Sequence, residues 1–360
     1  MMRSKSDEAD GLNMTIDIWA FNIFTSGAAP APEDFTAAAC RDAYDGYLEL
    51  CPKLEQWGLD GVFFAEHHFS TLFIAPSPQL IVASVAARTT RLRLGIMGSV
   101  LAMHDGRRFV EECGMLDMLT DGRYEPGIGP GAGDAEAVLS GLPAEQIRPR
   151  YYSAAELLRK STESAYVTHQ DDFYNLVDVP IVPRPQHDPA RPVWTTIMSP
   201  GSAGWAAERG WKVCTGWLPR PVAAQVTEAY RTAARAAGTP SGPQMLALRR
   251  RVFVAPSDAE ALETAEAAAN LTQLGLAAQG EAADPNVAAM LSHPDDFIVG
   301  SPQAVAEQIV EQCREGGFGT FAAWSDYAAF SRADLFRSYE LLGTQVAPVV
   351  RSAALEQASV

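Results

Sequence analysis

Apolar segments typical of buried β-strands alternate with helical patterns along almost the whole chain. After most of these segments, apolar residues recur every three or four positions, as on one face of a helix. The candidate strands are residues 14–22, 61–66, 91–101, 124–129, 193–199, 211–217, 246–256 and 320–324. Eight strands alternating with helices over about 330 residues predict an α/β fold of the (β/α)8 TIM barrel class. A doubly wound parallel sheet is the alternative.

Two stretches are longer than a minimal barrel needs. Residues 171–192 are rich in proline and are expected to form a surface hairpin or excursion, whereas residues 277–297 contain small residues without a clear period. The second stretch is a candidate lid over the site, and a tolerated surface loop explains it equally well. Because no composition break marks a second domain, residues 14–360 are expected to form one barrel domain after a flexible extension at 1–13.

Charge and cysteine usage exclude several classes of protein. A formal net charge of −16 without a basic stripe argues against binding to nucleic acid or to an acidic membrane surface. The five cysteines are widely spaced and include no C-x-x-C pair, so neither a disulfide framework nor a metal site is expected. The polar start lacks the apolar stretch of a signal peptide, and no apolar run is long enough to span a bilayer. We therefore expect a cytoplasmic protein.

Three titratable residues, Glu66, His67 and His68, stand at the end of the second predicted strand. Barrel enzymes carry their chemistry at the carboxyl ends of the strands. Because strand side chains alternate, one histidine is expected to face the barrel mouth and the other to pack sideways, which argues against a metal pair. The inward histidine suits general acid–base catalysis. Satisfied polar residues at the edge of the core are the structural alternative.

The fourth strand runs into a glycine-rich loop in which Gly127 and Gly129 begin a G-x-G-x-x-A match. The match is weak as a dinucleotide fingerprint, because it follows the fourth strand and no helix is expected immediately after Ala132. We interpret these glycines as backbone that approaches a planar ligand or a phosphate closely. An ordinary glycine-rich loop is the alternative.

A possible phosphate site follows the fifth strand. Ser199 and Ser202 stand at the start of a predicted helix, where unpaired N–H groups and two hydroxyls can hold an anion. Arg150, expected at the start of the helix after the fourth strand, could supply the countercharge. Simple helix capping is the more economical explanation of the two serines by themselves.

Several of these segments together resemble the bacterial luciferase-like flavin-dependent monooxygenase family. The resemblance rests on FFAEHHF, RLRLGIMGSVLAMHDGRRFVEECGMLDMLTDGRYEPGIGPG, RYYSAAELLR and PRPQHDPARPVWTTIMSPGSAGWAAERG. It implies a (β/α)8 barrel that takes reduced FMN from a separate flavin reductase and uses O2 as co-substrate. In that family a C4a-(hydro)peroxyflavin forms, and one oxygen atom enters a small organic substrate.

The resemblance also assigns residues. His67 matches the family's catalytic histidine, and Glu66 and His68 match its catalytic neighbours. Met97–Gly98 matches a position where the family often has a non-proline cis peptide beneath the isoalloxazine ring. The implied cofactor-binding residues are Met97, Gly98, Gly127, Gly129, Arg150, Ser199 and Ser202. No metal ligand is implied.

The chain departs from the family at three positions. Pro130 stands where an arginine often grips the flavin phosphate, Gly129 stands where the luciferases have a reactive cysteine, and Met198 replaces an acidic residue. These changes argue against light emission, and they predict that FMN binds weakly.

Other functions remain open. A deazaflavin-dependent oxidoreductase and a non-catalytic, subunit-like flavin-binding protein are the main alternatives, whereas a metal-dependent hydrolase lacks ligands. No charged pocket is identifiable in the sequence, so a neutral carbonyl substrate is expected, oxidised as an aldehyde or by a Baeyer–Villiger reaction. The family also implies a homodimer that pairs through the helices after the early strands.

Overall fold

The structure is a computed structural model, and it describes residues 15–25, 31–71, 73–131, 134–185, 187, 192–278 and 294–356. The predicted extension at 1–13 and most of the insertion predicted at 277–297 lie outside these residues. Each of the candidate strands is present. The barrel strands are β1 (Asp17–Asn22), β2 (Gly61–Phe64), β3 (Arg93–Ile96), β4 (Ser99–Val100), β5 (Tyr124–Glu125), β6 (Gly127–Gly129), β9 (Trp194–Thr196), β10 (Lys212–Gly216), β11 (Leu246–Val254) and β13 (Thr320–Trp324).

These strands form a closed parallel sheet. They pair in the order β4-β6-β9-β10-β11-β13-β1-β2-β3-β5. β3 and β4 are two parts of one predicted strand, and so are β5 and β6, which Pro126 separates. Because β3 pairs with β5 and β4 pairs with β6, the two ends of the path meet. The predicted (β/α)8 barrel is therefore confirmed, and the doubly wound sheet is excluded.

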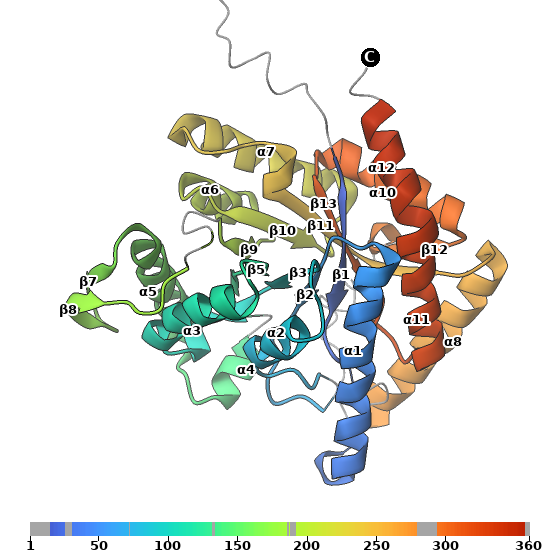
Figure 1. The fold of residues 1–360 in the computed structure, drawn as a ribbon, viewed down its shortest axis with the longest axis horizontal. Helices are drawn as coiled ribbons and strands as arrows, with labels where there is room; N and C mark the ends of the chain where they lie inside the picture. The colour runs from blue at the N-terminus through green and yellow to red at the C-terminus, as the bar shows by residue number, and fades with distance from the viewer. Residues whose placement is uncertain are drawn as a thin grey trace, which may run out of the picture.

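Helices surround the sheet, as Figure 1 shows. Local signals set their ends: the side chain of Thr36 accepts a hydrogen bond from the backbone of Ala39 at the start of α1, and Gly58 ends α1 with a φ of 88°. The helices are η1 (Pro32–Asp34), α1 (Ala37–Trp57), α2 (Pro78–Ala86), η2 (Leu101–Met103), α3 (Gly106–Leu119), α4 (Asp134–Leu139), α5 (Ala144–Glu163), α6 (Pro200–Glu208), α7 (Arg220–Ala237), η3 (Pro243–Met245), α8 (Asp258–Ala278), η4 (Pro294–Asp296), α10 (Pro302–Gly316), α11 (Arg332–Leu341), η5 (Leu342–Val346) and α12 (Ala347–Glu356).

The structure differs from the sequence prediction in four places. The proline-rich insertion is a hairpin, as expected, but its strands are β7 (Tyr166–Gln170) and β8 (Asn175–Pro180), so it begins earlier. The insertion at 277–297 ends in a strand that was not predicted, β12 (Phe297–Gly300), which pairs with β11. α5 begins six residues before Arg150, because Pro149 lies inside the helix instead of preceding it. Finally, α4 begins at Asp134, where no helix was expected.

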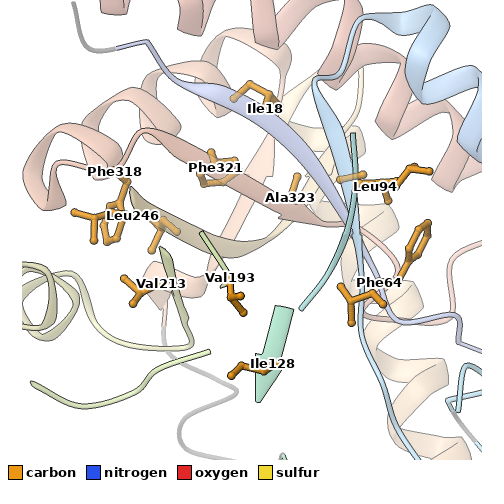
Figure 2. Packing of buried hydrophobic residues seen from close by; sticks show 14 of the residues in the cluster. Ile18, Phe64, Leu94, Ile128, Val193, Val213, Leu246, Phe318, Phe321 and Ala323 are labelled. Carbon is orange, nitrogen blue, oxygen red and sulfur yellow. The ribbon is translucent and has the colours of Figure 1, made fainter. Parts of the chain in front are cut away.

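Alternate residues of the barrel strands build two separate apolar layers. One layer packs against the helices, and Figure 2 shows part of it, with Ile18, Phe64 and Phe321 on neighbouring strands. The other layer contains residues of the strands and their following loops but no residue of α1 to α12. It is made of Trp19, Phe21, Ile23, Phe63, Ala65, Met97, Trp194, Cys214, Ala247, Ala322 and Trp324. Because strand side chains alternate, this second layer, here called the inner cluster, fills the barrel interior.

Candidate active site

Glu66 lies just past the carboxyl end of β2 and forms the centre of a buried hydrogen-bonded group. Glu66 as a whole residue is only 4% exposed. Nε2 of His68 lies 2.9 Å from Oε1 of Glu66, and Nε2 of His104 lies 2.9 Å from each of the two carboxylate oxygens. His104 lies in the segment between η2 and α3, which follows β3 and β4. The carboxylate of Glu66 thus joins the segment after β2 to the segment after β4.

Hydrogen bonds within this group shift the pKa of Glu66 and that of His104. Burial raises the pKa of the Glu66 carboxyl, but hydrogen bonds from His104 and His68 outweigh burial and hold the pKa below its ordinary value. For His104, burial lowers the pKa, whereas the hydrogen bond and negative charge of Glu66 outweigh burial and raise it overall. Glu66 is therefore a carboxylate at neutral pH, and His104 keeps a proton more readily than an ordinary histidine.

His67 points away from this group. Its ring centre lies 4.6 Å from that of Phe73, which packs against the inner cluster. Nδ1 of His67 lies 2.8 Å from Oε1 of Glu136 in α4, and Oε2 of Glu136 accepts a hydrogen bond from the backbone N–H of His68. The two histidines thus point to different sides, as the alternation of strand residues predicted.

The peptide bond between Met97 and Gly98, which separates β3 from β4, is cis, as the resemblance implied. A Cβ on Gly98 would come within 2.4 Å of the backbone of Ile128, and a Cβ on Gly127 would lie 1.7 Å from the carbonyl oxygen of Ile96. The neighbouring strand therefore requires these two glycines. Gly129 differs in that a Cβ there would lie close to a side chain instead of the backbone, 2.9 Å from Oγ1 of Thr196.

The serines predicted as phosphate ligands stand at the start of α6. Ser199 is the N-cap residue: its hydroxyl accepts from the backbone N–H of Ser202 and lies 3.1 Å from the hydroxyl of Ser202. Ser199 is exposed, and a Cβ on Gly201 would meet nothing within 4 Å, so the helix end is open. Capping is confirmed, and the open N–H and O–H groups also suit a phosphate.

Arg150 does not contact either serine within the described part of the chain. Its Nε donates to Oε1 of Gln146 at 3.3 Å, and its guanidinium lies 5.1 Å from the ring centre of Phe173 in the β7–β8 hairpin. Two positions further along α5, Tyr152 does contact α6, because its ring centre lies 5.3 Å from that of Trp205. α5 and α6 are therefore neighbours, but the predicted pairing of Arg150 with the serines is absent in this geometry.

Three residues of the site were missed in the sequence. His104 follows the third predicted strand, so the rule that barrel sites lie at carboxyl strand ends could have found it. Glu136 offered no signal, because only the turn of α4 brings it to His67. Arg249 did offer one: three consecutive arginines, 249–251, interrupt a strand that is otherwise apolar and entirely buried.

Arg249 places a buried charge beside the inner cluster, although no charged pocket was identifiable in the sequence. Its guanidinium is buried among rings of the inner cluster and its neighbours, 4.1 Å from the ring centre of Trp217 and 4.7 Å from that of Trp324. Two aromatic residues near the end of β2, Phe64 and Phe69, lie outside the inner cluster. Phe64 packs in the outer layer against the helices, and Phe69 is 62% exposed, whereas Trp19, Phe21 and Met97 do belong to the inner cluster.

Neither a membrane-spanning helix nor a metal site is found among the described residues. No helix among them is both long and apolar enough to cross a membrane. No group of three or more histidine, cysteine, aspartate or glutamate side chains in the same residues could hold a metal ion. The cysteines at 40, 51, 113, 214 and 313 are all free thiols.

Curated relatives share part or most of the chain. An uncharacterized protein of Sinorhizobium fredii, y4wF, is 36% identical over 59% of this chain and 60% of its own length. The oxygenase component of a flavin-dependent trigonelline monooxygenase from Acinetobacter baylyi is 27% identical over 48% of each chain. Limonene 1,2-monooxygenase of Rhodococcus erythropolis is 26% identical over 84% of this chain and 80% of its own. The chain thus spans 60% of the first of these relatives and 48% of the second.

Solved structures share the fold over nearly the whole chain. The monooxygenase RslO1 of Streptomyces bottropensis has a TM-score of 0.79 at 21% identity, covering 92% of this chain and 99% of its own. The oxygenating constituent of 3,6-diketocamphane monooxygenase from Pseudomonas putida, in complex with FMN, has a TM-score of 0.72 at 21% identity, with coverages of 93% and 99%. An F420-dependent secondary alcohol dehydrogenase has a TM-score of 0.70 at 18% identity, with coverages of 94% and 100%.

The sequence profile of one family spans most of the chain. Residues 19–320 match the family described as luciferase-like monooxygenase. This range contains all the barrel strands except the first two residues of β1 and the last four of β13, and it includes Glu66, His67, His68 and Arg249. The protein therefore belongs to the luciferase-like monooxygenase family.

Proposed function

We propose that the protein uses reduced FMN and O2 to oxidise a small organic carbonyl compound, by aldehyde oxidation or a Baeyer–Villiger reaction. The observation that carries the proposal is the position of His67. His67 follows Phe63 and Ala65 at alternate positions, and both of these belong to the inner cluster. It therefore lies on the inward side at the carboxyl end of the barrel, and its Nδ1 is hydrogen-bonded to Glu136. Family membership and the relatives named as monooxygenases support this reading.

The residues present fit an FMN phosphate and ring. The open end of α6 offers the hydroxyls of Ser199 and Ser202, and Arg150 lies on the neighbouring α5. The cis bond at Met97–Gly98 lies at the barrel mouth, where the isoalloxazine would rest. Bound reduced FMN would supply the activation of O2 at its C4a position. The FMN complex of a structure with the same fold supports this choice of cofactor.

His67 would hold or move a proton at its Nε2. When Nδ1–H donates to Glu136, Nε2 is left as the free acceptor of a neutral imidazole. Glu136 would also stabilise the imidazolium formed when Nε2 takes up a proton. Glu66, His68 and His104 would act indirectly, because their mutual hydrogen bonds fix the backbone from which His67 projects.

The inner cluster would keep water from the reacting atoms. Trp19 stacks on Phe63 with ring centres 4.3 Å apart, and the edge of Trp194 meets Phe63 at 5.3 Å. These three rings form an apolar layer in the barrel interior beneath the mouth. Exclusion of water prevents the unproductive decay of reactive flavin species.

The deazaflavin-dependent reaction is a second candidate for the same site. The likeness to an F420-dependent secondary alcohol dehydrogenase favours it, with a TM-score close to that of the FMN complex. A non-catalytic, subunit-like role is the third candidate, and the hydrogen-bonded His67 argues against it.

Two partners complete the proposal. A separate flavin reductase would deliver the reduced FMN, as the relative named an oxygenase component suggests. A second copy of the chain would cover α2 and α3, which carry exposed apolar side chains: Leu80 is 69% exposed, Met115 51% and Leu119 60%. Sedimentation of the purified chain tests the homodimer, because a monomer at micromolar concentration would contradict it.

Stopped-flow absorption tests the reaction directly. The protein is mixed anaerobically with reduced FMN and then with oxygenated buffer. We expect a flavin transient that outlasts the oxidation of free flavin and that decays faster with carbonyl substrates. Oxidation as fast as in a protein-free control would reject FMN-dependent oxygenation, and a parallel assay with reduced F420 then tests the second candidate. Because Pro130 replaces an arginine, we expect weak binding of oxidised FMN, and a submicromolar dissociation constant would contradict that expectation.

A further inference from the structure

Arg249 is a buried cation in the barrel mouth to which the proposed reaction assigns no role. The residue is 3% exposed. Its guanidinium lies 4.1 Å from the ring centre of Trp217, 4.7 Å from that of Trp324 and 5.8 Å from that of Phe21. Phe21 and Trp324 belong to the inner cluster, and Trp217 packs against it. The charge therefore lies in the barrel interior, on the side of β1, β10, β11 and β13.

The neighbouring strand is built around this side chain. A Cβ on Gly216 would come within 2.5 Å of Nε of Arg249, so β10 can pass only because residue 216 has no side chain. The next residue, Trp217, has a φ of 59°, a conformation that residues other than glycine rarely adopt. In that conformation its indole lies over the guanidinium. Aromatic faces hold a guanidinium in place without using its N–H groups.

Donors in this group lack acceptors. Nη1 of Arg249, Nε1 of Trp217 and Nε1 of Trp324 are buried and have no hydrogen-bond partner among the described residues. Buried donors are almost always paired in native proteins, because an unpaired one loses its interaction with water. Unpaired donors gathered around one guanidinium therefore point to a ligand that accepts their hydrogen bonds.

The charge of Arg249 is also only partly balanced. Its Nη2 lies 3.5 Å from Oδ1 of Asp296, but the same carboxylate lies 3.8 Å from Nη1 of Arg250 and 3.3 Å from Nη1 of Arg251. Arg250 points to the other side of β11, where its Nε donates to Oε1 of Gln312 at 2.8 Å. Asp296 is thus shared among three guanidinium groups, so an additional anion near Arg249 is electrostatically favoured.

We propose that Arg249 and Trp217 form a substrate subsite for a carboxylate, so that the substrate of this protein is an organic acid whose reacting group lies elsewhere in the molecule. A planar carboxylate can offer one oxygen to Nη1 of Arg249 and the other to an indole N–H, and its flat shape fits between aromatic rings. The proposal rests on the proposed function for the reaction, but the subsite itself is a binding property.

Binding of small probes tests the subsite without flavin or oxygen. Benzoate is compared with benzamide, and propionate with propionamide, by quenching of the intrinsic tryptophan fluorescence of the full chain. We expect each carboxylate to bind at least about tenfold more tightly than its amide, the effect of one charge-assisted hydrogen bond. Equal affinities within both pairs, or no saturable binding of either acid, would overturn the proposal.

Variants assign the preference to one side chain. Arg249→Met should abolish the preference for carboxylates and leave the binding of benzamide unchanged, and Arg249→Lys should retain part of it. Arg250→Gln is the matched control, because it removes the next arginine of the same strand and should retain the whole preference. If Arg249→Met does not fold, as circular dichroism would show, Arg249→Lys and the wild-type comparison decide.

Two outcomes would reject Arg249 as the ligand of the acid. One is a carboxylate preference that survives Arg249→Met. The other is an Arg249→Met variant that loses affinity for FMN while its preference for acids persists, which would assign the guanidinium to the flavin. The binding tests do not depend on the stopped-flow reaction, and the stopped-flow reaction does not depend on the binding tests. Each experiment can therefore reject its own proposal without affecting the other.

Discussion

Two buried charges at opposite ends of the barrel interior, Glu125 and Arg249, are held in opposite ways. At the amino-terminal end, the fully buried side chain of Glu125 forms ion pairs with Arg93 and with Lys212, whose Nζ lies at 3.5 Å. Glu125 also accepts a hydrogen bond from Nε1 of Trp194. At the carboxyl end, Arg249 shares one carboxylate with two other arginines and keeps a buried N–H without a partner.

The difference separates charges that support the fold from charges that are available to a ligand. A buried group whose partners come from several strands joins those strands, and its loss leaves uncompensated charges. A buried donor without a partner does not stabilise the folded state, and one that lies beside the inner cluster, as Nη1 of Arg249 does, is available to a ligand. In TIM barrels the carboxyl end carries the site and the opposite end carries stability. The following predictions test this division, starting with the largest effect.

His67→Ala should lower the rate of substrate oxidation by about 100-fold to 10⁴-fold, the usual contribution of a general acid or base. Stopped-flow turnover with reduced FMN measures it. Binding of FMN should change little, because His67 lies beside the inner cluster and not at the start of α6. Glu136→Gln is the control and should lower the rate less, since it keeps an acceptor for Nδ1. Loss of FMN binding in His67→Ala would make His67 a structural or ligand residue.

Glu125→Ala should lower the free energy of unfolding by about 3 kcal/mol, because it leaves Lys212 and Trp194 without their buried partner. Urea denaturation measures the change. The rate per folded molecule should remain close to that of the wild type. The matched control is Glu163→Ala, which removes an exposed ion pair with Arg159 and should cost less than about 1 kcal/mol. A large loss of activity with unchanged stability in Glu125→Ala would break the division between the two ends.

His104→Gln tests a paired group at the carboxyl end. It should lower the free energy of unfolding by about 2 kcal/mol at pH 6, the value of a buried hydrogen bond to a charged group. The pKa of His104 is raised in the folded protein, so its contribution is complete below the unfolded pKa and is lost as the pH rises through the folded pKa. The wild type should therefore lose its advantage over the variant as the pH rises above 6.5, the ordinary pKa of histidine.

Glu66 acts with the opposite sign on the acid side. Its pKa is lowered in the folded protein, so its contribution is present above the unfolded pKa and is lost as the pH falls through the folded pKa. Wild type and His104→Gln should thus converge again in strong acid. A difference between them that does not vary with pH would contradict the ion-pair description.

Arg249→Met should change the free energy of unfolding by less than about 1 kcal/mol, because it removes an unpaired buried donor and leaves Asp296 with two arginines. Thermal and urea denaturation measure it. A loss as large as that of Glu125→Ala would show that Arg249 supports the fold, and the contrast between the two ends would disappear.

Much of the fold could be predicted because its signals are local. Apolar segments of strand length, periodic helices and capping residues such as Ser199 and Gly58 act within a few positions of each other. A surface hairpin was expected within residues 171–192 from their prolines, and the hairpin found begins earlier, at Tyr166. β12 was missed because its four residues follow a stretch without periodicity. Local chemistry also placed Glu66, His67 and His68 at a strand end.

The sequence by itself determined the order of strands and helices, the barrel and the histidine pair at its mouth, because these depend on periodicities that repeat over short distances. Tertiary structure alone decided which groups meet. Glu136 reaches His67 across 69 positions, His104 reaches Glu66 across 38, and Asp296 reaches Arg249 across 47. A linear pattern carries no distance between such residues. Only closure of the sheet brings Trp217 and Arg249 together and leaves their donors without partners.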